Sequence, residues 1–533
     1  TNKAATEMRA RVDSLIGERS GSAAAARIWV HTFHAFCARL LRREIGKLPG
    51  RESEFVIATQ ADQLAILRRL VGPGEGPGAL KPADVLTVIE RAKHNLVEPD
   101  GFPAHTPREQ RFKEFYEGYQ NELLDSGALD YADLIMVTVR LFREHPAVLE
   151  RWRSRFRHIL VDEYQDTNAA QHELVRLLAG NGLGLAAVGD PDQGIYGWRG
   201  ADPENMLRFC EDFENVRVIS LLENYRSTQT ILKAANALID HNPRLGGHEK
   251  ELWTRGEEGE KVSVYAGSDE YDESGFIATE IFRSVNTEKK ANYADFAILY
   301  RTNAQSRILE DALRKRSIPY TTIAGSRFYD RREIRDLLAY LRLLVNPNDI
   351  LSFRRIINVP SRGVGKISVD RVLEEVEKSP ASLFDTVRRC IDDELVPPRA
   401  RRAIVKLVDL LDELTMVREP VDKLLELLLE RVDYTGWLQK AGDAVSRLEN
   451  VEEFVDTAHD FISSNPAGTL EEFLEEVSLA APIDDFDETA GSVSLLTLHA
   501  AKGLEFPIVF ISGVEEGLLP LKYKSDLVDY EVE

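Results

Sequence analysis

The sequence predicts an α/β protein with parallel sheets and two large helical insertions. Two observations support this fold class. Apolar runs bounded by turn residues are typical of buried parallel strands, and they lie at 158–161, 183–188, 216–221, 296–300, 493–497 and 508–512. Helical periodicity covers most of the remaining chain, above all 53–98, 108–126, 331–345 and 366–480. The two long helical stretches, near 45–128 and 346–485, are the predicted insertions.

Length and composition indicate a large protein with several cores. A chain of 533 residues, 43% of them hydrophobic, is expected to form about three or four domains. The three cysteines, Cys37, Cys210 and Cys390, are far apart and show neither metal-binding nor disulfide spacing. No apolar run reaches the roughly 18 residues that span a bilayer. These features predict a soluble, cytoplasmic protein without a membrane partner.

The charge distribution limits how the protein can meet nucleic acid. The net charge of −22 argues against a protein that coats nucleic acid, because such binding rests on Lys and Arg. The charge is uneven: residues 1–50 hold nine Lys or Arg against four acids, and residues 401–533 hold 11 against 29. Any contact with nucleic acid is therefore expected to be local.

The first segment with chemical potential is Ile159-Leu-Val-Asp-Glu-Tyr-Gln-Asp-Thr-Asn168. A buried strand that ends in Asp162 and Glu163 places two carboxylates at the carboxyl edge of a parallel sheet, where open α/β folds bind ligands. In a P-loop ATPase the first acid holds Mg²⁺ and the second orients or deprotonates the attacking water. The alternative is a pair of acids that cap the next helix. Gln165, Asp166 and Asn168 beside them favour the ATPase interpretation.

The second segment, residues 187–201, follows another short strand. Gln193 stands where a strand-end side chain can sense a γ-phosphate. Tyr196, Trp198 and Arg199 offer two aromatic faces and a guanidinium on which unstacked bases can rest. The alternative for these rings is core packing, which a glycine-flanked polar loop disfavours.

The third segment is Leu221-Leu-Glu-Asn-Tyr-Arg-Ser-Thr228. Arg226 has the chemistry of an arginine finger, and Tyr225 can stack on adenine. The alternative is a helix start with Ser227 or Thr228 as the N-cap and Arg226 in a surface salt bridge.

The fourth segment, Thr497-Leu-His-Ala-Ala-Lys-Gly-Leu-Glu-Phe506, lies between two predicted strands. Thr497 and His499 can bond a DNA phosphate, and Glu505 can accept hydrogen bonds from a ribose. A plain strand-to-helix connection with a solvated Lys502 is the alternative.

The four segments, in this order and spacing, resemble the superfamily 1 helicases of the UvrD, Rep and PcrA group, the PcrA branch most. Further matching segments lie at 1–8, 31–37, 129–135, 300–307, 328–334 and 358–365, so the resemblance runs along essentially the whole chain. It implies a P-loop NTPase fold of two RecA-like parallel-sheet domains, with ATP between them and a DNA single strand across both. The implied domains are a first RecA-like domain at 1–44 and 129–218 with an insertion at 45–128, and a second at 219–345 and 486–533 with an insertion at 346–485.

The resemblance also implies an activity and roles for residues. It implies an ATP-dependent 3′-to-5′ DNA helicase, acting in repair or replication on single strands and single/double-strand junctions, with accessory proteins as partners. The implied cofactors are ATP and Mg²⁺, with Asp162 as the metal ligand and Glu163 as the catalytic base. Gln193 and Arg226 are implied to read the γ-phosphate, Tyr225 the adenine and Glu505 the ribose. The residues implied to line the DNA strand are Thr32, His34, Tyr131, Tyr196, Trp198, Arg199, Arg301, Asn303 and His499.

The sequence also departs from the family pattern. No G-x-x-x-x-G-K-[ST] phosphate loop occurs in the 533 residues. In the family that loop, and a glutamine segment that reads adenine, lie upstream of the segment that opens this chain, and a further arginine motif follows the point where it stops. We therefore expect a chain truncated at both ends that hydrolyses almost no ATP alone. Gly194 replaces a frequent Ser and Gly197 an Arg of the PcrA branch, both expected to be mild changes.

Two other interpretations remain open from the sequence. One is a catalytically silent DNA-binding or interaction module on the same scaffold, and the other is the helicase subunit of a helicase–nuclease complex. The intact Asp162, Glu163, Gln193 and Arg226 favour the motor enzyme, since strand binding alone does not require a magnesium site.

Overall fold

A computed structural model describes residues 2–20, 28–72, 80–182, 184–197, 200–242, 250–322, 328–379, 381–417, 420–439, 444–479 and 491–520. Contacts divide the chain into two compact units, each built from two stretches of sequence. Unit 1 comprises residues 1–151 and 326–480, and unit 2 comprises residues 152–325 and 481–533.

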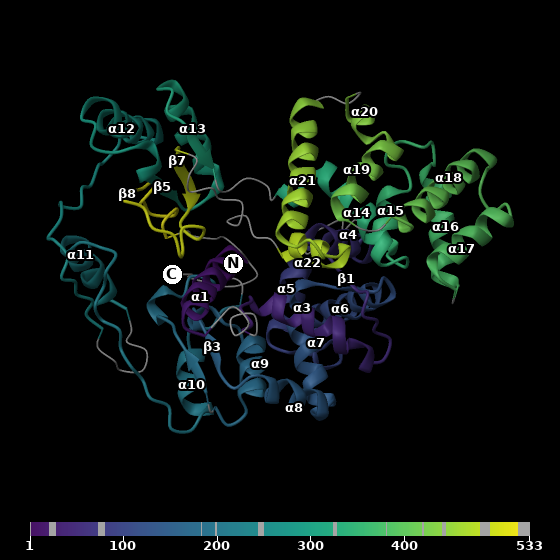
Figure 1. Ribbon diagram of the computed structural model, residues 1–533, viewed down its shortest axis with the longest axis horizontal. Coiled ribbons are helices and arrows are strands. Elements are labelled where there is room, and N and C mark those ends of the chain that lie inside the picture. The colour runs from purple at the N-terminus through teal and green to yellow at the C-terminus, as the bar shows by residue number, and fades with distance from the viewer. Residues whose placement is uncertain are drawn as a thin grey trace. The chain divides into compact units, whose positions relative to one another are not determined.

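Unit 1 is almost entirely helical (Figure 1). Its first stretch holds α1 (Asn2–Ser20), α3 (Phe33–Glu44), α4 (Gln60–Val71), α5 (Pro82–His94), α6 (Pro107–Asp125), α7 (Tyr131–Glu144) and the start of α8 (Pro146–Arg155). The parallel pair β1 (Val56–Ile57) and β2 (Ala128–Leu129) brackets α4 to α6. Its second stretch holds α14 (Arg332–Val345), α15 (Ile350–Ile356), α16 (Lys366–Lys378), α17 (Leu383–Asp392), α18 (Pro398–Thr415), α19 (Val421–Val432), α20 (Tyr434–Gln439), α21 (Ala444–Ser464) and α22 (Leu470–Leu479).

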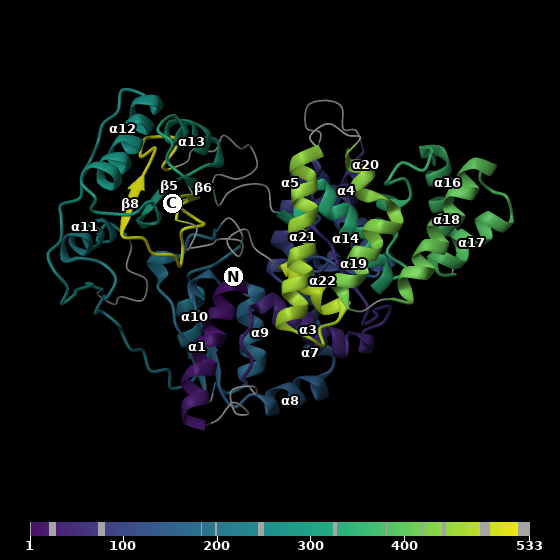
Figure 2. The same ribbon diagram turned by 45° about the horizontal axis from the view of Figure 1, so that its top comes forward.

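Capping residues define where several of these helices begin. Thr59 with Asp62 on α4, and Thr106 with Glu109 on α6, form reciprocal capping boxes. Each box satisfies backbone N–H groups that a helix start leaves without partners. Apolar faces then pack into two clusters, one among α4, α5 and α6, the other from α14 to α22. Figure 2 shows α19 beside α21 in the second cluster.

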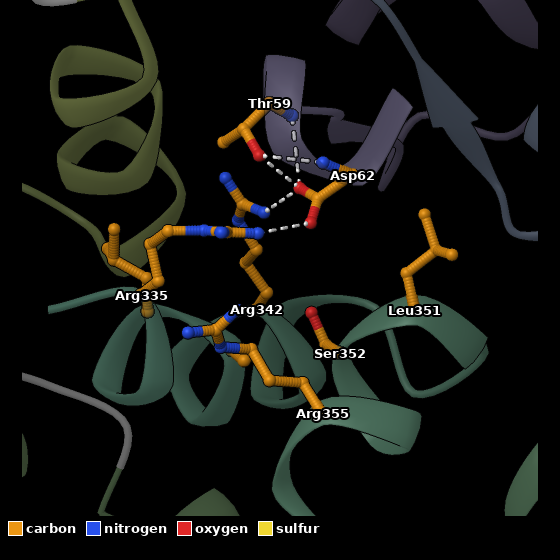
Figure 3. Close-up of a pocket in the computed structure, with 9 residues that line it drawn as sticks. Thr59, Asp62, Arg335, Arg342, Leu351, Ser352 and Arg355 are labelled. Carbon is orange, nitrogen blue, oxygen red and sulfur yellow. Dashed lines mark hydrogen bonds and ion pairs between the residues drawn. The ribbon is translucent and has the colours of Figure 1, made fainter. Parts of the chain in front are cut away.

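An ion-pair cluster ties α4 to α14 within unit 1. Figure 3 shows the guanidinium groups of Arg335 and Arg342 both reaching the carboxylate of Asp62. Its two carboxylate oxygens lie 3.2 Å from Arg335 and 3.1 Å from Arg342. Arg355 lies nearby and pairs with Asp336 on α14 at 2.7 Å. Both α4 and α15 are therefore joined to α14 by largely buried ion pairs.

Unit 2 contains two parallel sheets (Figure 1). The first pairs β3 (Ile159–Val161) with β4 (Leu185–Ala187) and carries α9 (Ala169–Ala179) and α10 (Asn205–Asp212). The second has the order β6-β7-β5-β8, formed by β5 (Phe296–Tyr300), β6 (Tyr320–Thr322), β7 (Val493–Thr497) and β8 (Ile508–Ile511). The remaining helices are α11 (Gln229–Ile239), α12 (Glu270–Phe282) and α13 (Ser306–Lys315), of which α12 and α13 pack on one face of the second sheet.

The predicted α/β class with parallel sheets is confirmed, and all but one of the predicted strands are present. The prediction of a strand at 216–221 was wrong. Val218, Ile219 and Leu221 are exposed there, and within the described residues no strand pairs with them. An apolar run becomes a strand only when a neighbour takes its backbone hydrogen bonds. The four-domain division of the chain stays a prediction.

None of the helices in the described part of the chain is long and apolar enough to cross a bilayer.

Candidate functional site

The carboxyl ends of β3 and β4 lie at the same edge of the first sheet. Val161 pairs with Ala187, so the residues that follow each strand emerge side by side. Asp162 and Glu163 follow β3, and both side chains are exposed. The two segments stay together beyond the strands, because the backbone N–H of Tyr164 donates to the carbonyl of Val188 at 2.9 Å. The edge therefore presents two exposed carboxylates, as a parallel strand ending in two acids predicts.

A row of hydrogen bonds connects Glu163 to Gln193. Gln165 is buried, and its Nε2 donates to Oε2 of Glu163 at 2.5 Å. Its Oε1 accepts from the backbone N–H of Asp190 at 3.0 Å. Oδ2 of Asp190 in turn accepts from Nε2 of Gln193 at 2.7 Å. The segments after the two strands thus share one polar network, which runs through Gln165.

Gly189 allows this close approach. A Cβ at that position would lie 2.6 Å from Oε1 of Gln165, a distance that real Cβ atoms do not show. Only glycine lets the backbone after β4 come so near to the Gln165 amide.

Lys502 reaches the same network from the segment after β7. Its Nζ lies 2.5 Å from Asp166, 2.8 Å from the Gln193 carbonyl and 3.6 Å from Glu163. Burial raises the pKa of Asp166, and the Lys502 ammonium acts against that rise. The alternative of a solvated Lys502 is contradicted, since its side chain is only 11% exposed. The signal that could have revealed it is its position beyond a parallel strand, the same position that placed the acids.

A second lysine, Lys250, was also not predicted from the sequence to belong to this edge. Lys250 pairs with Asp190 and lies 3.4 Å from Asp192, so two ammonium groups border this acidic edge. Because Lys250 lies in no strand-end segment, nothing in the local pattern predicts this contact.

Arg226 and Glu505 lie together at a different point of unit 2. Nε of Arg226 donates to Oε2 of Glu505 at 2.7 Å, and both side chains are well exposed. Tyr225 beside them is 86% exposed, and a hydrogen bond with Glu223 raises the pKa of its hydroxyl. Among the described residues, Arg226 makes no hydrogen bond or ion pair with Asp162 or Glu163.

The local structure of residues 221–228 fits neither the nucleotide-contact interpretation nor the helix-start interpretation in full. The side chain of Asn224 accepts from the backbone N–H groups of Arg226 and Ser227, at 2.9 and 2.8 Å. Thr228 is the N-cap of α11, as the helix-start alternative predicted, but its side chain makes no capping bond. Arg226 does form a salt bridge, yet its partner is distant in sequence.

The second sheet brings together three candidate DNA-contacting residues. Tyr300 pairs with Thr497 at the carboxyl ends of β5 and β7, so Arg301 and His499 emerge next to each other. Nη1 of Arg301 donates to the His499 ring at 3.3 Å. The Tyr196 hydroxyl donates to the backbone carbonyl of His499 at 3.1 Å, with the two rings 6.4 Å apart. Asn303 follows in an exposed turn.

The other candidate DNA contacts lie in unit 1 or outside the described residues. Thr32 is the N-cap of α3, and its hydroxyl accepts from the N–H of Ala35. The His34 ring on α3 lies 4.6 Å from the Tyr131 ring on α7. Trp198 and Arg199 lie outside the described residues.

No group of three or more His, Cys, Asp or Glu side chains gathers as a metal cage in the described part of the chain. Magnesium does not need such a cage, because it commonly binds one or two carboxylates together with substrate phosphates and water. Asp162, an exposed carboxylate at a strand end, fits this mode of binding.

Parallel sheets with polar side chains gathered at the carboxyl ends of their strands define the class of the chain, an α/β protein with a ligand-binding sheet edge. Residues 1–214 match the UvrD/REP helicase N-terminal domain, and residues 219–532 match the UvrD-like helicase C-terminal domain. The chain therefore belongs to the UvrD-like helicase family, which confirms the resemblance seen in its sequence.

Individual relatives agree with this assignment. The chain is similar to the ATP-dependent DNA helicase PcrA of Bacillus subtilis (strain 168), with 42% identity over 98% of this chain and 71% of the relative. Proteins of the same name from Staphylococcus epidermidis and Staphylococcus aureus are 41% identical over the same shares.

Proposed function

We propose that this protein is a motor that hydrolyses ATP to move 3′-to-5′ along single-stranded DNA and unwinds the duplexes it meets. The observation that carries the proposal is the loop after β4, which contacts both candidate sites. Gln193 lies in the hydrogen-bonded row that begins at Glu163. Three residues further on, Tyr196 donates to His499, beside Arg301. The loop after β4 thus connects the proposed nucleotide site at Glu163 to the proposed DNA contacts at His499 and Arg301.

The acidic edge is the proposed site of hydrolysis. Asp162 holds Mg²⁺, which when bound offsets the negative charge of the transferring phosphoryl group. Glu163 takes the proton of the attacking water, and its contact with Gln165 fixes the direction of the carboxylate. Lys502 and Lys250 supply the positive charge that keeps several acids together at this edge.

Arg226, Tyr225 and Glu505 are proposed to contact the nucleotide. The exposed Tyr225 ring is available to stack on adenine, while Arg226 reads the γ-phosphate with Gln193 and Glu505 binds the ribose. In this structure Arg226 and Glu505 hold each other. An exposed ion pair of this kind is worth only about 0–1 kcal/mol, so the nucleotide can replace it at little cost.

DNA contacts are proposed at the carboxyl edge of the second sheet in unit 2 and, separately, at the start of α3 and α7 in unit 1. Arg301 and His499 supply phosphate contacts, and aromatic side chains supply stacking that tolerates any base sequence. The contacting residues are Thr32, His34, Tyr131, Tyr196, Trp198, Arg199, Arg301, Asn303 and His499. Single strands and single/double-strand junctions are the proposed substrates, with accessory proteins of repair or replication as partners.

ATP turnover is proposed to require a phosphate loop of the G-x-x-x-x-G-K-[ST] type. The 533 residues contain no G-x-x-x-x-G-K-[ST] loop, and without such a loop the β- and γ-phosphates lack their cradle of backbone N–H groups. We therefore expect this chain alone to bind single strands and to hydrolyse very little ATP.

The test is DNA-stimulated ATP hydrolysis by the full-length gene product and by this chain, each with and without a single-stranded oligonucleotide. We expect stimulated turnover in the full-length protein alone. Silence of the full-length protein, with single-strand binding retained, would instead support a catalytically silent DNA-binding module.

Direction of movement needs a separate measurement. Streptavidin is placed at either the 3′ or the 5′ end of a biotinylated single strand, and its ATP-dependent displacement is followed. A 3′-to-5′ motor displaces streptavidin from the 5′ end, and displacement from the 3′ end alone would contradict the proposed polarity.

A further inference from the structure

Lys93 on α5 is a fully buried cation between two fully buried carboxylates. Its Nζ lies 2.6 Å from Oδ2 of Asp130 and 2.7 Å from Oδ1 of Asp133. The exposed fraction is 0% for Lys93, 1% for Asp130 and 0% for Asp133. Charges are removed from water at a high cost in free energy unless they are paired and hydrogen-bonded. An arrangement of this kind places its members very specifically.

The surroundings complete the pairing. The Tyr119 hydroxyl donates to Oδ2 of Asp130 at 2.8 Å, and the Tyr119 ring lies 5.1 Å from the Lys93 ammonium. Gln120 donates to Oδ1 of Asp133 at 3.2 Å. These contacts come from α6, and α5, which carries Lys93, packs against both α6 and α7 (Figure 1).

Other charged groups also face the two carboxylates. Burial raises the pKa of Asp133, and the neighbouring Asp130 raises it further. Burial acts on Asp130 in the same direction, but Lys93, the backbone N–H of Asp133 and the Tyr119 hydroxyl together bring the pKa of Asp130 below its ordinary value. Arg51 and His94 are the further basic groups that act on this cluster.

Each carboxylate divides its two oxygens between Lys93 and the start of α7. Oδ1 of Asp130 accepts from the backbone N–H of Asp133 at 2.8 Å, and Oδ2 of Asp133 accepts from the backbone N–H of Asp130 at 3.1 Å. The remaining oxygen of each acid meets Lys93. Lys93 therefore holds both members of the capping box that begins α7.

Tyr131 is the first residue of that helix and lies between the two acids in the sequence. Its ring lies 4.6 Å from the ring of His34, with an angle of 48° between the planes. A shift at the start of α7 moves the Tyr131 backbone directly, since Asp130 and Asp133 flank it.

We propose that Lys93 is a positioning residue for single-strand binding, which sets the Tyr131–His34 ring pair by fixing the start of α7. This inference rests on the proposed DNA contacts of Tyr131 and His34. Lys93 is fully buried, so its effect on affinity is expected to pass through Tyr131.

A double-mutant cycle tests the proposal on this chain, with a fluorescein-labelled oligothymidylate as the probe. The variants are Lys93→Met, Tyr131→Ala and both together, compared with the unaltered chain at a temperature where circular dichroism shows all four folded. Tyr131→Ala is expected to weaken binding by roughly tenfold, the usual effect of losing a stacked base. Lys93→Met is expected to weaken it by roughly threefold to tenfold when Tyr131 is present, and not at all in the Tyr131→Ala background.

Lys81→Met is the matched control, because it removes a lysine from the exposed N-cap position of the same helix. It is expected to leave affinity unchanged. If Lys93→Met does not fold, Lys93→Met with Asp133→Asn replaces it, since that pair removes one charge of each sign and keeps an amide oxygen as the helix cap.

Equal weakening by the Lys93 change in both Tyr131 backgrounds, or no weakening in either, would overturn the proposal and leave Lys93 a purely structural residue. Failure of the unaltered chain to bind the oligothymidylate is a different result. It would overturn the proposed DNA-binding function itself, and the role of Lys93 with it.

Discussion

At the scale of single residues, Glu163 has an unusual backbone conformation. Its φ and ψ are 51° and 46°, in the left-handed region that side chains other than glycine rarely adopt. Such a conformation costs about 1–3 kcal/mol and persists only when the surroundings hold it. Here the hydrogen bonds of Tyr164 to Val188 and of Gln165 to the Glu163 carboxylate hold it. The carboxylate is therefore directed by the residues that follow it.

Glu163→Gln in the full-length protein is expected to keep ATP binding and to lower turnover by about 10²–10⁴-fold, because the group that accepts the proton is removed. Single-turnover hydrolysis and binding of a fluorescent ATP analogue measure the two effects separately. Glu214→Gln, at an exposed acid of the same unit, is the control and should leave both unchanged. Turnover near the unaltered rate in Glu163→Gln would remove Glu163 from the proposed role of base.

His31, beside the candidate DNA contact Thr32, is expected to stay neutral at pH 7. Its pKa is lowered to about 4, mainly by burial and to a smaller extent by the positive charges of Arg39 and Arg9. The folded protein thus binds fewer protons than the unfolded chain between about pH 6.5 and pH 4, so the contribution of His31 to stability falls as the pH drops through this range.

The measurement is the difference in free energy of unfolding between the unaltered chain and His31→Gln, taken at several pH values. That difference should shift against the unaltered chain from pH 7 to pH 4, whereas a pH-independent difference would mean that His31 has an ordinary pKa. The His31 ring signal in a proton NMR titration gives the pKa directly.

At the scale of elements, charged side chains decide how α4 is attached. Asp62 serves both as the capping residue of α4 with Thr59 and as the partner of Arg335 and Arg342 on α14. Burial acts to raise the pKa of Asp62, but Arg342, Thr59 and Arg335 together bring it below its ordinary value. One carboxylate thereby fixes both the start of a helix and its contact with another.

Asp62→Ala is expected to destabilise unit 1 by about 3–5 kcal/mol, since it leaves two largely buried arginines without their partner. Chemical denaturation followed by circular dichroism measures this loss. Glu109→Ala is the control, because Glu109 forms the same kind of capping box on α6, and it should cost much less.

The pH dependence gives a second check on Asp62. Because its folded pKa is lowered, its contribution is present above its ordinary pKa and is lost as the pH falls below that value. The difference in stability between the unaltered chain and Asp62→Ala should therefore shrink in acid. An undiminished difference at low pH would assign the effect to packing instead of charge.

At the scale of the whole molecule, the three cysteines differ in burial and in the unit to which they belong. Cys37 and Cys390 are buried in unit 1, and Cys210 is exposed in unit 2. Burial raises the pKa of Cys37 to about 12, and burial also raises the pKa of Cys390. Since the thiolate is the reactive form, the two buried thiols are inert in the folded protein.

With a disulfide reagent at pH 8, we expect one thiol per chain to react rapidly and all three to react in denaturant. Cys210→Ser should abolish the rapid phase. Rapid modification of Cys37 or Cys390, located by mass spectrometry, would contradict the packing of unit 1 described above.

The fold class was predictable because strands and helices leave local periodicities. The runs at 296–300 and 493–497 are mostly apolar, since parallel strands are covered on both faces, and they became β5 and β7. The run at 216–221 is also mostly apolar and is not a strand. Local pattern records a preference, but a strand also needs a neighbour, and the sequence does not state which neighbour is present.

The candidate site also has a part that the sequence predicted and a part that it did not. Asp162 and Glu163 were predicted because they follow a strand, and the carboxyl ends of parallel strands share an edge. His499 was predicted from a segment between two strands, and Arg301 from the family resemblance alone. The partners across long sequence separations, such as Arg226 with Glu505, could not be paired in advance. The roles proposed for all these residues in catalysis and DNA binding stay predictions.

The sequence by itself determined the α/β class, the helical segments, most strands and membership of the helicase family, because each leaves a signal within a few tens of residues. Only the tertiary structure decided that Lys502 is held among the acids, that Asp62 joins α4 to α14, and that Lys93 lies between two aspartates. The physical reason is that a charged side chain looks solvated in its local sequence. Its real environment is decided by which distant segments fold against it and whether they carry the opposite charge.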